Sequence, residues 1–229
     1  MSITTTKLTR AAGLCAVAGG LLFIGVQINH PHVDAGLVTT TEWAVRQTLK
    51  VLMAVLSLIG ITGMYLRQVK QIGVLGLLGY LVFAAGYLIM MSVEVIGAVV
   101  LPALVQSAPG YVADVLAVAT VGHATGDIGL MLPFSTAAGI TYLAGGLLFG
   151  IALFRANVLA RWAAAVLAGG TLATIAIPLL PQINERLFAV PTGIALIGLG
   201  YSLWREQRTA PGRTRPAAAS LPLNPADAK

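Results

Sequence analysis

The sequence predicts an all-α membrane protein, a polytopic helical bundle of six transmembrane helices, and three observations lead to that fold class. The 229 residues are 57% hydrophobic and only 10% charged, whereas soluble globular chains carry roughly 25% charged residues. Several uninterrupted apolar runs reach the ~20 residues that a helix needs to cross the hydrocarbon core of a bilayer. No run shows the alternation of polarity that is typical of membrane β-barrel strands.

The six predicted spans follow one another along residues 1–206, which we expect to form one transmembrane domain. They cover about residues 11–28, 46–66, 72–93, 129–154, 161–180 and 187–204. Apolar sequence continues beyond the third span to Val105, and residues 111–127 are apolar enough for an additional interfacial or re-entrant helix. Residues 207–229 are rich in Pro, Ala and Arg without a periodic apolar face, which predicts a disordered tail.

The distribution of Lys and Arg predicts the orientation of these spans. Eleven basic residues lie at one set of span ends and three at the other; the eleven are Lys7, Arg10, Arg67, Lys70, Arg155, Arg161, Arg205, Arg208, Arg213, Arg215 and Lys229. Because cytoplasmic loops carry the excess of basic residues, we expect a bacterial inner-membrane protein with both termini in the cytoplasm. A cleaved signal peptide is the alternative for the first span, but no small-x-small cleavage pattern follows it.

Several classes of partner and cofactor have no support in the sequence. The basic residues are scattered at span ends rather than gathered in a patch, so we expect no nucleic-acid partner. The single cysteine, Cys15, lies in the first span and allows no intrachain disulfide or Cys-based metal site. No cofactor is predicted. Gly146 and Gly150 form a GxxxG pattern, which favours close helix packing within the bundle and leaves a homodimer face as the alternative.

A charged stripe stands at the start of the second span. Glu42, Arg46 and Lys50 are four residues apart, so on a helix they share one face, with Glu N-terminal to each base in the favourable order for ion pairs. Trp43 beside them is a natural anchor at the membrane interface. Lys50 precedes the boundary residue Arg67 by 17 positions, about 25 Å along a helix, which places its charge within the outer hydrocarbon region.

Glu94 interrupts an otherwise apolar run at the same outer side. A charge at this depth costs at least ~2.5 kcal/mol when it faces lipid, so such groups usually point into the bundle and pair. We therefore expect Glu94 to point inward, toward Arg46 or Lys50. His123 and Asp127, four residues apart before the fourth span, complete this outer polar cluster.

A metal site at this cluster has weak support. Imidazole and carboxylate are suitable ligands, and His30, His32, His123, Asp127 and Glu94 all fall on the outer side. The two loop histidines need not converge, however, and neither an HExxH pattern nor a cysteine–histidine pattern occurs. We therefore assign no metal ligands, and structural hydrogen bonds and ion pairs remain the simpler interpretation.

We interpret the cluster as a polar pocket for a small amphiphilic or isoprenoid-like ligand, with membrane lipid as the surrounding partner. The predicted ligand-binding residues are Glu42, Arg46, Lys50, Glu94, His123 and Asp127. In an alternative, Glu94, Asp127 and His123 would be the catalytic residues of an intramembrane enzyme that protonates a lipophilic substrate, as small terpene cyclases do. An aromatic content of 7% argues against that chemistry. A small transporter or a structural subunit is the third alternative.

The order of several short motifs resembles a known family. These motifs are residues Arg10 to Gly13, Leu78-Gly79-Tyr80 followed by Glu94, His123 before a Gly-rich span, Leu153-Phe154-Arg155 and Leu159-Ala160-Arg161-Trp162. Over residues 7–206 the chain looks like a family of small bacterial six-helix integral membrane proteins filed as a domain of unknown function. The resemblance implies six helices and adds weight to Glu94 and His123, but it implies no activity.

Overall fold

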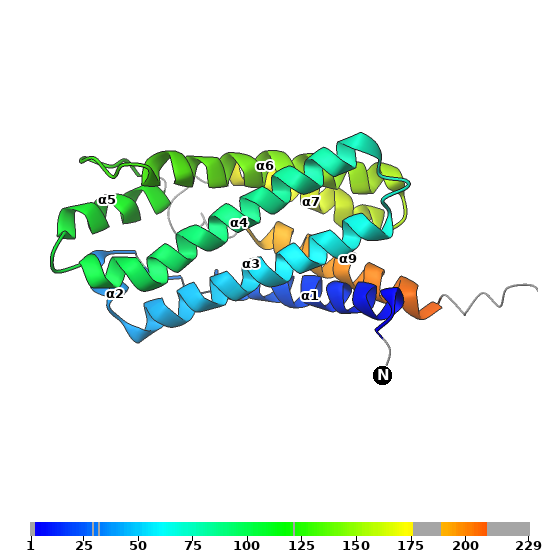
Figure 1. The fold of residues 1–229 in the computed structure, drawn as a ribbon, viewed down its shortest axis with the longest axis horizontal. Helices are drawn as coiled ribbons and strands as arrows, with labels where there is room; N and C mark the ends of the chain where they lie inside the picture. The colour runs from blue at the N-terminus through cyan, green and yellow to red at the C-terminus, as the bar shows by residue number, and fades with distance from the viewer. Residues whose placement is uncertain (1–2, 29, 32, 121, 176–188, 210–229) are drawn as a thin grey trace, which may run out of the picture.

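A computed structural model of the chain describes residues 3–28, 30–31, 33–120, 122–175 and 189–209, and this part is helical without any strand (Figure 1). The predicted all-α class is therefore confirmed. The helices are α1 (Thr5–Gly25), α2 (Ala35–Val38), α3 (Thr41–Arg67), α4 (Gly73–Leu104), α5 (Pro109–Ala119), α6 (Met131–Ala156), α7 (Arg161–Ala173) and α9 (Val190–Thr209).

Four of the described helices, α1, α3, α4 and α6, are long and apolar enough to cross a membrane. They correspond to the first four predicted spans. The fifth and sixth predicted spans are represented by α7, which has 13 residues, and by α9, which has 20. Residues 176–188, which include the end of the fifth predicted span and the first residues of the sixth, lie outside the described part of the chain. The predicted tail also lies outside it, except that α9 continues to Thr209.

The helices run up and down in one elongated bundle. The most extensive packing is between α4 and α6, between α1 and α9, and between α1 and α3. The start of α1 and the end of α9 lie at the same end of the bundle, and the short helices α2 and α5 lie at the opposite end (Figure 1). We call this opposite end the α2–α5 end, and it is where the predicted polar cluster falls.

The predicted third span and its apolar extension form one continuous helix, α4, of 32 residues. Pro102 does not shorten α4, because it lies only two residues before the last residue of the helix. At 1.5 Å per residue α4 is about 48 Å long, more than the ~30 Å of a hydrocarbon core. The end of α4 and the following α5 therefore form a cap at the α2–α5 end, at the place of the predicted additional helix.

Glycines allow the helices to approach closely inside the bundle. A Cβ at Gly79 of α4 would lie 2.6 Å from the backbone nitrogen of Phe149 in α6. Gly146 and Gly150 face Thr171 and Ala168 of α7. The GxxxG pattern therefore serves packing within one chain, as expected from the first of the two interpretations.

Candidate functional site

The start of α3 is fixed by two hydrogen bonds at the α2–α5 end. The N-cap residue Thr40 accepts the backbone N–H of Trp43 at 3.2 Å. The indole Nε1 of Trp43 donates to the backbone oxygen of Gly97 in α4 at 2.8 Å, and the side chain is only 5% exposed. Trp43 therefore joins α3 to α4 inside the protein, rather than anchoring the helix in the membrane interface as the sequence suggested.

The three charged residues of the α3 stripe take different partners. Arg46 pairs with Glu42 at 2.9 Å and also donates to the backbone oxygens of Val26 and Ile28 beyond the end of α1. Lys50, one turn further along α3, pairs instead with Glu94 of α4, with 3.3 Å between Nζ and Oε2. Glu94 thus points into the bundle toward Lys50, as predicted.

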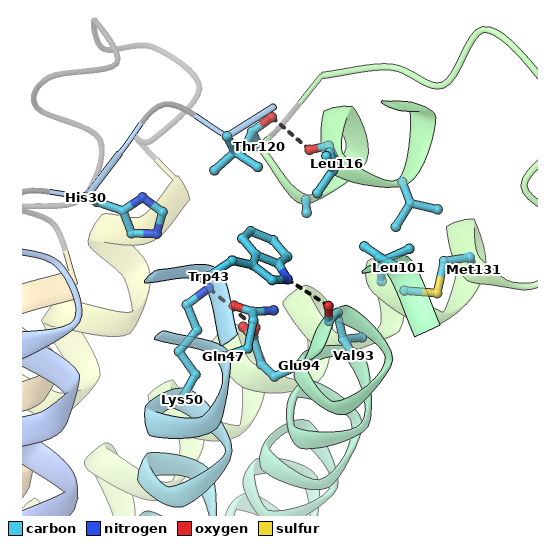
Figure 2. A pocket seen from close by; sticks show the side chains of 15 residues that line it. His30, Trp43, Gln47, Lys50, Val93, Glu94, Leu101, Leu116, Thr120 and Met131 are labelled. Atoms are coloured by element: carbon cyan, nitrogen blue, oxygen red, sulfur yellow. Dashed lines mark hydrogen bonds and ion pairs between the residues drawn. The ribbon is translucent and has the colours of Figure 1, made fainter. Parts of the chain in front are cut away.

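The Lys50–Glu94 ion pair lies beside a cavity of about 90 Å³ (Figure 2). Its walls come from α3, α4, α5 and the start of α6, with His30 and Val33 contributed by the segment before α2. The polar lining residues are His30, Gln47, Lys50, Glu94, Thr120 and Ser135. Trp43, Leu101, Leu116 and Met131 give the cavity an apolar side opposite the ion pair.

Gln47 is the most buried of the polar cavity residues that the sequence interpretation missed. Its side chain is 3% exposed, and in the described part of the chain its Oε1 has no hydrogen-bond partner. Glycine at position 97 makes room for it, because a Cβ there would collide with Nε2 of Gln47. Gln47 carries no charge, so only its position one turn after Trp43, on the face that leads toward α4, could have indicated its role.

His123 and Asp127 do not join this site. Both are exposed and lie in the connection between α5 and α6, and neither lines the cavity. Asp127 accepts the backbone N–H of Gly129 at 2.8 Å, which is a local turn contact. The sequence analysis included both in the outer polar cluster, but they lie between the end of α5 at Ala119 and the start of α6 at Met131.

The remaining predicted residues are divided between two places. Glu42 and Arg46 line a separate groove of about 520 Å³ between the end of α1 and α3, together with apolar residues such as Val45 and Leu49. His30 lines the cavity, whereas His32 lies outside the described residues. Within the described part of the chain, no group of three or more His, Cys, Asp or Glu residues is arranged to hold a metal ion.

Asp114 of α5 organises the loop beside the cavity and was not singled out from the sequence. Its Oδ1 accepts the backbone N–H and the hydroxyl of Thr125 at 2.8 and 3.0 Å, and its Oδ2 accepts the N–H of Gly126 at 2.8 Å. The bonds from the backbone of Thr125 and Gly126 lower the pKa of the Asp114 carboxyl. A carboxylate on α5 thereby holds the loop that leads into α6.

No protein-family model, curated protein or solved structure matches this chain. The site is therefore interpreted from its own geometry. It combines an ion pair shielded from solvent, an unpaired buried amide oxygen and an apolar wall, which is an arrangement suited to holding a small group with a hydrogen-bond donor.

Proposed function

We propose that this chain is a six-span inner-membrane protein with both termini in the cytoplasm, and that its cavity at the α2–α5 end binds the polar head group of a small amphiphilic ligand. The α2–α5 end would then face the periplasm. The eleven-to-three distribution of basic residues supports this orientation. The common location of the start of α1 and the end of α9 supports an even number of spans (Figure 1).

The observation that carries the proposed binding site is the unpaired Oε1 of Gln47. A buried carbonyl oxygen without a donor costs about 1–3 kcal/mol, so a ligand that brings a donor gains this energy on binding. The neighbouring Lys50–Glu94 pair has no net charge, which favours a neutral hydroxyl head group over a charged one. A neutral amphiphilic alcohol therefore fits the chemistry of the lining best.

The volume of the cavity limits how much of the ligand it takes. Typical ligand sites enclose roughly 300–1,000 Å³, whereas this cavity measures about 90 Å³. It accommodates a hydroxyl group and a few carbon atoms, so the rest of an isoprenoid-like chain would lie outside the cavity. The proposal is therefore recognition of a head group and not enclosure of a whole lipid.

The acid-catalysed alternative has less support from the geometry. Of its three residues, His123 and Asp127 are exposed and lie away from the cavity lining. The third, Glu94, is already engaged in an ion pair with Lys50. No contact of the described residues favours transport or a subunit role.

The proposal is tested with two matched probes, farnesol and the hydrocarbon farnesene, on the full chain in lipid nanodiscs. We expect farnesol to raise the thermal unfolding temperature Tm and farnesene to leave it unchanged, because only the alcohol supplies a donor to Gln47. The variant Gln47→Leu should fold with an unchanged or higher Tm, since it removes an unsatisfied oxygen, and should lose the response to farnesol. Glu42→Gln, outside the cavity, serves as the control and should keep it.

Equal responses to farnesol and farnesene would contradict the proposal, because they would report bulk partitioning of an apolar chain into the bilayer. A farnesol response that persists in Gln47→Leu would place the binding site elsewhere.

A further inference from the structure

A further groove lies at the end of the bundle opposite the cavity, between the start of α1 and the end of α3 (Figure 1). It measures about 710 Å³, which is within the roughly 300–1,000 Å³ that is typical of ligand sites. Its lining extends from Thr5 to Ala12 in α1 and from Leu58 to Arg67 in α3. We call it the Thr5–Arg67 groove.

Small residues bring the two helices together in this groove. Ala12 and Gly63 both line it and are buried, and a Cβ at Gly63 would collide with the Cβ of Ala12. Larger apolar residues of the same lining remain open to the surroundings: Leu8, Ile59 and Leu66 are 60%, 44% and 63% exposed. The groove therefore combines a close helix contact with apolar side chains that face the bilayer.

The length and the polarity of the groove match one leaflet of a bilayer. Arg67 and Leu58 are nine residues apart, or about 13 Å along α3, and half of a hydrocarbon core is about 15 Å thick. Because α1 and α3 run in opposite directions, Thr5 and Thr6 lie at the same end of the groove as Arg67. One end is thus lined by hydroxyls and a guanidinium, and the other by apolar side chains.

The threonines further along the groove make little difference to its apolar part. Thr9 donates its hydroxyl to the backbone oxygen of Thr5 at 2.9 Å, and Thr62 donates to that of Leu58 at 2.7 Å. A hydroxyl that is bonded to its own helix in this way is already satisfied. The deeper part of the groove is therefore suited to a hydrocarbon chain.

The charge at the polar end of the groove favours an anionic head group. The basic residues where α1 begins and where α3 and α9 end include Lys7, Arg10, Arg67, Lys70 and Arg205, whereas Glu206 is the one acidic residue described there. Clusters of Lys and Arg at a membrane surface attract anionic lipids. In the groove of about 520 Å³ at the α2–α5 end, by contrast, the charges of Glu42 and Arg46 cancel.

Arg67 is the residue best placed to contact a phosphate. Its Nη2 pairs with the carboxylate of Glu206 in α9, and its side chain is 31% exposed. A guanidinium carries five N–H donors, so the pair with Glu206 leaves donors for a second acceptor. The planar guanidinium also suits the geometry of a phosphate group.

We propose that the Thr5–Arg67 groove binds an anionic phospholipid. One acyl chain lies along Leu8, Ile59 and Leu66, and the phosphate lies at Arg67 and the hydroxyls of Thr5 and Thr6. This site is at the opposite end of the bundle from the Lys50–Glu94 cavity, so it does not depend on the ligand proposed there.

Native mass spectrometry of the full chain tests the site. The protein is released from detergent in the presence of equimolar phosphatidylglycerol and phosphatidylcholine with identical acyl chains. We expect phosphatidylglycerol to be retained about fivefold more than phosphatidylcholine, which is roughly the factor that one basic residue contributes at a membrane surface. Equal retention of the two lipids, or retention of neither, would overturn the proposal.

A larger side chain in the groove tests where the acyl chain lies. Ile59→Trp should fill the groove and abolish the preferential retention of phosphatidylglycerol. The matched control is Leu52→Trp, because Leu52 lies on the same helix, is 46% exposed and does not line the groove; it should keep the preference. Retention that is equal in the two variants would place the lipid elsewhere, and a dimer that only Ile59→Trp disrupts would show that a second copy of the chain occupies the groove.

The double variant Arg67→Gln/Glu206→Gln tests the head group without filling the groove. It removes the guanidinium together with its partner, so the net charge of the protein does not change and no unpaired carboxylate remains. The preference for phosphatidylglycerol should fall by about fivefold. An unchanged preference would overturn the proposal, because it would show that the general positive charge of this end, and not Arg67, selects the lipid.

Discussion

Two ion pairs on consecutive turns of α3 differ in almost every respect except their chemistry. Glu42 and Arg46 lie in one helix, their atoms are 2.9 Å apart, and the Glu42 side chain is 51% exposed. Lys50 and Glu94 join two helices at 3.3 Å, and each side chain is only 17% exposed. The shorter pair is at the surface, and the longer one lies beside the cavity (Figure 2).

The comparison shows that the effect of an ion pair on stability depends more on its burial and its partners than on the distance between its atoms. An exposed pair gains ~0.2–1 kcal/mol because water competes for both charges. A shielded pair contributes little net stability itself, but the loss of one partner leaves the other charge uncompensated. We therefore expect substitutions at Glu94 in α4 and at Glu42 in the neighbouring α3 to change the stability of the protein by very different amounts.

The largest effect is expected for Glu94→Leu. This substitution leaves the Lys50 ammonium without its partner in a site that is 17% exposed. Fully buried pairs lose ~3–5 kcal/mol in this way, and the residual exposure reduces the expected loss to about 2–3 kcal/mol. Thermal unfolding in lipid nanodiscs should show Tm lowered by more than 5 °C.

The double variant Lys50→Met/Glu94→Leu is the matched control. Two apolar side chains of similar size should restore most of the lost stability, since no charge remains to be desolvated. A double variant as unstable as Glu94→Leu alone would show that packing at position 94, and not the ion pair, is responsible.

A similar contrast exists between two aspartates, with a smaller expected effect. Asp114 binds Thr125 and Gly126 across 11 and 12 residues, whereas Asp127 binds Gly129 two residues away. Asp114→Ala should release the loop and raise the hydrogen-exchange rates of the Thr125 and Gly126 amides. Asp127→Ala should leave those two rates unchanged. Equal exchange in Asp114→Ala and in the unsubstituted protein would show that the loop is held by other contacts.

The contribution of Asp114 should also depend on pH. Its pKa in the folded protein is lowered by the backbone N–H groups of Thr125 and Gly126. Its stabilising contribution is therefore fully present above the ordinary aspartate pKa and is lost as the pH falls through the lowered value, below about pH 4. Protection of the two amides should decrease there in the unsubstituted protein, while Asp114→Asn should show no such step.

The smallest effect is expected for Glu42→Gln. Its side chain is half exposed, and Arg46 keeps the backbone oxygens of Val26 and Ile28 as acceptors. The change in unfolding free energy should stay below about 0.5 kcal/mol, so Tm should move by no more than 2 °C. A decrease as large as that of Glu94→Leu would remove the contrast between the two pairs.

The features that could be predicted from the sequence are those that depend on the length of apolar runs and on charge. The four long helices follow from apolar runs, and the inward direction of Glu94 follows from the cost of a carboxylate in lipid. Gln47 escaped notice because an amide has no formal charge and because it stands among the polar residues Arg46, Thr48 and Lys50 at the start of the span. The six-span count, the orientation and the family resemblance stay predictions.

The placement of His123 and Asp127 failed for a different reason. They were included in the outer cluster because they lie four residues apart just before the fourth span, but Gly122, Gly126 and Gly129 lie around them, and Gly129 adopts a left-handed φ of 57°. Glycines this dense favour a loop over a helix. That signal was present in the sequence and outweighs a four-residue spacing.

The most direct test of the account is the density in the Lys50–Glu94 cavity of the full chain purified with its native lipids. We predict a non-protein molecule whose polar end lies within about 3.2 Å of Oε1 of Gln47. A cavity that holds only water, or a Gln47 whose oxygen is bonded to a donor of the protein itself, would contradict head-group recognition at this site.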